Sequence, residues 1–223
     1  MKLKVNENND YQAHRLVIEN LSVLEMAPTF VAEVEKRVFA KIDERIRNWV
    51  EEQDKWEGTF TGFLEDETSF KPKSWPTDDR GYYCAYYTIG CDKRGGEDFK
   101  YWLSSLVGAV DYQLGILFSV TAPDITRLSG KGTRPGQAWK NFLAKEYGER
   151  PQLKELGFQL SSESLFYPLY IDAAALASAY PDSLEDVLWP LDEGLERLAK
   201  AHHEIDQLLA IALTWPFTKG GAL

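Results

Sequence analysis

The sequence is poor in the residues that most often form disulfides, bind metals or act as nucleophiles. Among its 223 residues are only two cysteines, three histidines and two methionines. Cys84 and Cys91 both fall in one apolar run, Tyr82–Cys91, that we interpret as a β-strand. The two cysteines are seven residues apart, so they lie roughly 20 Å from each other along the strand and their side chains point to opposite faces. A disulfide between them is excluded, because it requires Cα atoms within about 7 Å.

Positive charge is also scarce. Lys and Arg total 25, against 35 Asp and Glu, which gives a formal net charge of -10. A field of this sign repels phosphate backbones and anionic lipids, so generic binding to nucleic acids or membranes is disfavoured. The only basic cluster that the sequence suggests consists of Arg127, Lys131, Arg134 and Lys140.

The sequence contains no uninterrupted run with the apolar character of a membrane span. The nearest approach, Tyr101–Pro123, has Asp111 near its centre, where a charge costs ~3 kcal/mol. A helix followed by a buried strand explains this run better. The first residues, Met1–Asp10, are polar and show no secretory signal, so we expect a cytoplasmic protein.

Amphipathic helices are predicted near both ends of the chain. In Pro28–Glu57, apolar residues recur every three or four positions, with Pro28 in the first turn. A shorter helix over Tyr11–Met26 is predicted to precede it. The final helix is predicted over Leu184–Ala212, and it either begins or kinks at Pro190.

The middle of the chain has the short apolar runs that are typical of strands. Strands are predicted within Thr59–Ser74 (two, joined by the acidic turn Glu65-Asp66-Glu67), at Tyr82–Cys91 and Leu114–Thr121, and near Phe158 and Leu169; helices are predicted from Glu97 and over Ala138–Tyr147. We therefore expect an α+β fold, in which long N- and C-terminal amphipathic helices cover a mostly antiparallel sheet. A single domain over residues 1–223 is expected, with about ten flexible residues at the N-terminus and about eight at the C-terminus.

One short motif has a family resemblance. Gly95-Gly96-Glu97-Asp98-Phe99 resembles the signature loop of diguanylate cyclases, which in that family is a hairpin turn contacting phosphate and metal. The residues that follow it here have helical spacing, and no matching acidic strand precedes it. We interpret the motif as the start of a helix.

A second pattern supports an alternative function, that of a metal-dependent hydrolase or nuclease acting through clustered carboxylates. Asp78 is followed by Asp98 and Lys100, the arrangement with which some nucleases hold Mg²⁺. That chemistry needs the acid and the lysine on one face, as on a strand. On a helix their spacing turns them ~200° apart, which weakens the alternative.

The remaining metal candidate is the pair His202 and Asp206, one helical turn apart. Gln207 stands where a zinc protease would have its second histidine. His202 also falls on the apolar side of the predicted helix, which is typical of a packed core histidine. We therefore predict no metal site, no cofactor and no catalytic residues.

Aromatic residues make up 13% of the chain and include seven tryptophans. Trp75, Trp139, Trp189 and Trp215 lie near the ends of predicted elements or in loops. Protein interfaces are enriched in tryptophan, so these four are candidates for a role in recognition.

Acidic residues are concentrated in the last predicted helix. From Asp182 to Asp206 there are eight acids against Arg197 and Lys200. The predicted partner-binding residues are Asp182, Glu185, Asp186, Trp189, Asp192, Glu193 and Glu196. Our leading hypothesis is a non-enzymatic binding module of inhibitor, immunity or anti-defence type, encoded by a phage or bacterium. Its expected partner is a protein with a basic surface, for example a nucleic-acid-binding protein; self-association into a homodimer is a further possibility.

Overall fold

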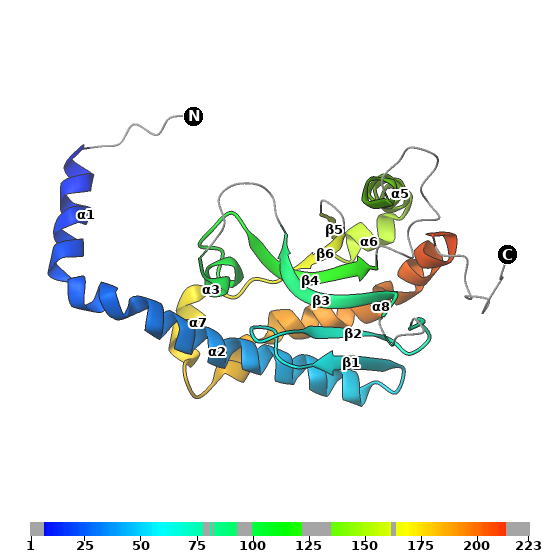
Figure 1. The fold of residues 1–223 in the computed structure, drawn as a ribbon, viewed down its shortest axis with the longest axis horizontal. Coiled ribbons are helices and arrows are strands. Elements are labelled where there is room, and N and C mark those ends of the chain that lie inside the picture. The colour runs from blue at the N-terminus through cyan, green and yellow to red at the C-terminus, as the bar shows by residue number, and fades with distance from the viewer. Residues whose placement is uncertain are drawn as a thin grey trace.

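The computed structural model describes residues 7–77, 81, 83–92, 100–121, 135–161 and 164–212. Its centre is a six-stranded antiparallel sheet of order β1-β2-β3-β4-β6-β5 (Figure 1). The strands are β1 (Trp56–Phe60), β2 (Thr68–Pro72), β3 (Ala85–Asp92), β4 (Gln113–Val120), β5 (Gln159–Leu160) and β6 (Leu165–Pro168). The predicted α+β fold is confirmed.

Helices precede, interrupt and follow the strands. They are α1 (Glu7–Glu19), α2 (Leu21–Glu52), α3 (Trp102–Leu106), α5 (Pro135–Glu149), α6 (Pro151–Glu155), α7 (Ala173–Ala179), the 3-10 helix η2 (Leu184–Val187) and α8 (Trp189–Ala212). Figure 1 shows the long helices α2 and α8 running beside the sheet, while α1 points away from it. No helix in the described ranges has the length and apolar character needed to cross a membrane.

Alternation along the strands decides which face of the sheet is buried. In β3, Tyr87 and Ile89 point to the same side as their β4 partners Phe118 and Ile116, and all four are almost fully buried. The helices α2 and α8 lie against this face and bury their own apolar sides there. A hydrophobic core therefore lies between one face of the sheet and the two long helices.

The N-terminal helices begin and end at other residues than predicted. α2 starts at Leu21, so Pro28 lies inside the helix rather than in its first turn. Proline lacks the N–H that would bond the Leu24 carbonyl, but this turn is exposed to solvent, where the lost hydrogen bond costs less than in a buried helix. The predicted helix Tyr11–Met26 is interrupted at Asn20, whose side-chain amide donates to the Leu16 carbonyl at 2.8 Å.

At its other end α2 is shorter than predicted. It stops at Glu52, and Trp56 and Glu57, assigned to the helix from sequence, begin β1. Trp56 continues the helical spacing in sequence, yet it is buried against the sheet residues Phe70 and Tyr87. Tertiary packing of this one indole overrides the local period.

The elements after β3 are of the types predicted from the sequence, but several differ from the prediction in length. The helix predicted from Glu97 is described only as α3, which ends before Gly108, a glycine with φ of +68° that L side chains rarely adopt. In the final segment, the alternative in which the helix begins near Pro190 is confirmed, since α8 starts at Trp189 and η2 precedes it. The short helices α6 and α7 were not predicted.

Candidate functional site

The predicted partner-binding residues lie on η2, on the residues before it and on the first turns of α8. Trp189, Glu193 and Glu196 follow one another at intervals of four and three residues, so they share one side of α8. That side is opposite the buried Leu191, Leu195 and Leu198 of the same helix. The structure therefore brings part of the predicted set together on one exposed ridge.

Three of the seven predicted residues are engaged within the chain. Glu185 and Asp192 bind cations of α2, and Glu193 binds a cation one turn along α8. The pairs are Lys41 Nζ–Glu185 Oε1 at 2.7 Å, Arg45 Nη2–Asp192 Oδ2 at 2.6 Å and Arg197 Nη2–Glu193 Oε1 at 2.9 Å. Glu185 and Asp192 thereby attach η2 and α8 to α2, a structural use that the sequence did not reveal.

The contacts of α2 with η2 and α8 also shift the pKa values of side chains in these pairs. A hydrogen bond from Lys41 lowers the pKa of Glu185, and the reciprocal bond to Glu185 raises the pKa of Lys41. A hydrogen bond to Asp192 likewise raises the pKa of Arg45. The charged forms of Lys41, Glu185 and Arg45 are therefore favoured.

The other four predicted residues remain exposed. Asp182, Asp186 and Glu196 form no ion pair with any described residue, and Trp189 is 63% exposed. We call Asp182, Asp186, Trp189 and Glu196 the Trp189 surface. It combines a large amphipathic ring with negative charge that nothing in the described chain neutralises.

Two of the other tryptophan candidates are wrong. Trp75 is 1% exposed and Trp139 is 4% exposed, so neither can meet a partner. Trp75 packs on Tyr87 and donates through Nε1 to Asp206 at 2.5 Å, while Trp139 stacks on Phe142. Trp215 lies outside the described residues.

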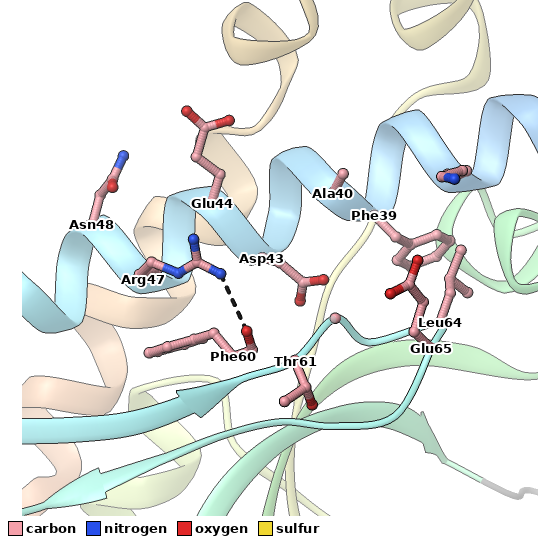
Figure 2. Close-up of a pocket in the computed structure, with 12 residues that line it drawn as sticks. Phe39, Ala40, Asp43, Glu44, Arg47, Asn48, Phe60, Thr61, Leu64 and Glu65 are labelled. Carbon is pink, nitrogen blue, oxygen red and sulfur yellow. Dashed lines mark hydrogen bonds between the residues drawn. The ribbon is translucent and has the colours of Figure 1, made fainter.

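A groove of about 540 Å³ lies between α2 and the loop that joins β1 to β2 (Figure 2). Its floor includes Asp43, which is 7% exposed and accepts hydrogen bonds from the Phe63 backbone N–H at 2.8 Å and from the Thr68 hydroxyl. Arg47 crosses the groove, donates to the Phe60 carbonyl at 3.2 Å and covers its ring. Both Asp43 oxygens are occupied, so this carboxylate holds the loop against α2 rather than serving as a general base.

The face of the sheet away from α2 and α8 has a second, polar hollow of about 460 Å³. It is lined by Thr59, Glu67, Ser69, Gly81, Tyr83, Tyr86 and Thr121. Beside it, the ammonium of the almost fully buried Lys71 contacts Glu57 Oε1 at 2.5 Å and the Trp75 carbonyl at 2.7 Å, and lies over the Tyr83 ring. Sequence reasoning missed this hollow, because hydroxyl residues on strands separated in sequence carry no recognisable spacing.

His202, just past the middle of α8, lies in an aromatic cluster. Its ring is 5.6 Å from that of Trp56 and 5.9 Å from that of Trp75, and its Nε2 is 3.2 Å from Asp206 Oδ2. Burial lowers the pKa of His202, an effect that Asp206 partly opposes. His202 therefore packs on aromatic rings as expected, but it is half-buried rather than in the core, and its Nδ1 has no partner among the described residues.

No cluster of three or more His, Cys, Asp or Glu residues suited to a metal ion occurs in the described part of the chain. Asp78 and Asp98 of the nuclease alternative, the glycine motif at 95–99, and Arg127, Lys131 and Arg134 of the basic cluster all lie outside the described residues. Lys100 and Lys140 are described and exposed.

Comparison with known proteins gives no relative: no protein-family model, no curated protein and no solved structure matches this chain.

Proposed function

We propose that the chain is a non-enzymatic protein-binding module, of inhibitor, immunity or anti-defence type, that docks on a basic protein through the Trp189 surface. The observation that carries this proposal is the 63% exposure of Trp189 in a segment whose exposed carboxylates Asp182, Asp186 and Glu196 form no ion pair with a described residue. Tryptophan is among the residues that dominate binding energies at interfaces, because it buries a large area with few rotamers to fix.

The charge around Trp189 favours a basic partner. Asp182, Asp186 and Glu196 add to a chain whose net charge is -10, so cationic proteins are attracted from a distance and anionic ones repelled. Glu185, Asp192 and Glu193 contribute to this field only weakly, since Lys41, Arg45 and Arg197 neutralise them. The proposal therefore places direct contact on four of the seven residues predicted from sequence.

The test measures binding of a fluorescent Lys/Arg-rich peptide by anisotropy, at low and at physiological salt. Reversal of Asp182, Asp186 and Glu196 to Lys should weaken binding at least tenfold, and Trp189→Ala should weaken it several-fold at both salt concentrations.

A matched control reverses three exposed acids elsewhere, Glu51, Asp111 and Glu155, and so changes the net charge equally. It should retain most of the affinity. If both triple variants lose the same affinity and Trp189→Ala loses none, the peptide senses only net charge, and the Trp189 surface is not a docking site.

A further inference from the structure

Residues 11–30, which we call the arm, comprise most of α1 and the start of α2. Nine of the large apolar side chains that are exposed in the described chain belong to this segment, each between 45% and 69% exposed: Tyr11, Leu16, Val17, Ile18, Leu21, Val23, Leu24, Met26 and Phe30. None of its residues is buried. Figure 1 shows the arm extending beyond the end of the sheet, where no other described element covers it.

An uncovered helix of this length is not self-sufficient. α1 has 13 residues, and isolated helices shorter than about 12–15 residues are marginal in water, because most helical stability comes from packing of an apolar side. The nine side chains also form a larger apolar surface than a monomer ordinarily exposes. The arm therefore requires an apolar surface to pack on.

The charges of the arm differ from those of the rest of the chain. Its charged residues are Arg15, Glu19 and Glu25 alone, a net charge of -1, whereas the whole chain carries -10. A basic partner gains little electrostatic attraction here. A surface that is apolar and has both signs of charge at its edges is complementary to a copy of itself.

We propose that the arm binds the arm of a second copy of this chain, with the two α1 helices antiparallel. In a two-fold contact centred on Val17, Arg15 of each copy lies opposite Glu19 of the other, and Leu16 lies opposite Ile18. Each exposed side chain offers on the order of 100 Å², so the four on α1 supply on the order of 400 Å² per copy and the five at the start of α2 on the order of 500 Å² more. Both parts of the arm must enter the contact for it to reach the roughly 800 Å² per partner of stable interfaces.

The first test is the mass of the full chain by light scattering after size exclusion, from about 1 to 100 μM, a range that covers micromolar dissociation constants. We expect twice the 25.4 kDa of one chain. Ile18→Glu and Leu24→Glu should give 25.4 kDa without lowering the thermal midpoint of the sheet and core, since neither side chain is buried. The control Ile211→Glu, at an equally exposed residue of α8, should leave the mass of the dimer unchanged.

The second test examines the antiparallel arrangement. Arg15→Glu should weaken the dimer severalfold, and combining it with Glu19→Arg should restore it, because the swap rebuilds both charge pairs. A swap that fails to restore dimerisation overturns this arrangement. A chain that is monomeric at all concentrations overturns the proposal, whether or not it then binds vesicles of phosphatidylserine and phosphatidylcholine.

Dimerisation through the arm is independent of the Trp189 surface. Trp189→Ala should weaken peptide binding several-fold and leave the mass at that of two chains, whereas Ile18→Glu should halve the mass and leave the intrinsic peptide affinity of each chain. The failure of either proposal is thus visible without reference to the other.

Discussion

Arg45 of α2 holds Asp192 of α8 in a two-pronged ion pair, with Nε–Oδ1 at 2.7 Å and Nη2–Oδ2 at 2.6 Å. The two residues are 147 positions apart in sequence, and the contact fixes the two long helices relative to each other. Paired hydrogen bonds of this kind are directional as well as attractive, so the register of α8 against α2 is set here.

The first prediction concerns this pair. A double-mutant cycle with Arg45→Ala and Asp192→Ala should give a coupling free energy of about 1 kcal/mol, the upper end for partly exposed pairs. The same cycle on Lys41 and Glu44, an exposed pair within α2, should give a smaller coupling. Urea unfolding measures both, and equal couplings would contradict the prediction.

The second prediction concerns Asp43. Asp43→Ala should lower the free energy of unfolding by about 2–3 kcal/mol, because the Phe63 N–H and the Thr68 hydroxyl lose their acceptor. Asp43→Asn, which keeps one acceptor oxygen, should lose less. The neighbouring control Glu44→Ala should cost under about 1 kcal/mol, since its only pair is exposed. A neutral Asp43→Ala would show that the loop does not depend on this carboxylate.

The third prediction concerns pH. The pKa of His202 is lower in the folded chain than its usual 6.5, so the unfolded chain binds more protons below that pH. Keeping His202 neutral therefore costs no free energy of unfolding above about pH 6.5. Below that pH the free energy of unfolding falls as the pH drops towards the folded pKa of His202. Urea unfolding of His202→Gln between about pH 5 and 7.5 should show a shallower loss than the wild type. A loss as steep in His202→Gln as in the wild type would contradict the prediction.

The fourth prediction concerns two glycines. A methyl group added to Gly115 of β4 would lie 2.2 Å from the Tyr167 carbonyl oxygen and 2.5 Å from the Phe166 ring, so Gly115→Ala should cost about 3 kcal/mol or more. In α5, nothing lies within 4 Å of the corresponding position on Gly148, and Gly148→Ala should stabilise the chain by up to about 1 kcal/mol. Thermal midpoints of the two variants should therefore move in opposite directions.

Periodicity in the sequence was enough to predict the elements that carry most of the core. The apolar positions of α2 and α8 repeat every three or four residues, and β3 and β4 are short apolar runs, so these four were identified in kind. The ends were harder to place. Trp56 extends the helical period of α2 in sequence, yet packs in β1, because that choice depends on Phe70 and Tyr87, which come later in the chain.

The sequence predicted the candidate site less well than it predicted the fold. An acidic run predicted the surface, but the acids that face Lys41 and Arg45 could be distinguished only once α2 and α8 lay side by side. Tryptophan near the end of an element proved a poor guide to exposure, since Trp75 is buried and Trp189 is not. Exposure depends on what covers a residue, and that is set by distant segments.

The contact between α2 and α8 determines when the core can close during synthesis of the chain. Synthesis proceeds from the N-terminus, so Arg45 leaves the ribosome 147 residues ahead of Asp192. At 5–20 residues per second this delay lasts roughly 7 to 30 seconds. The strands β1 to β4 appear within it and pair in the order in which they are made, which gives the apolar side of α2 an early covering. The core closes only with α8, so a nascent chain that stalls before α8 would expose the unclosed core to chaperones and proteases.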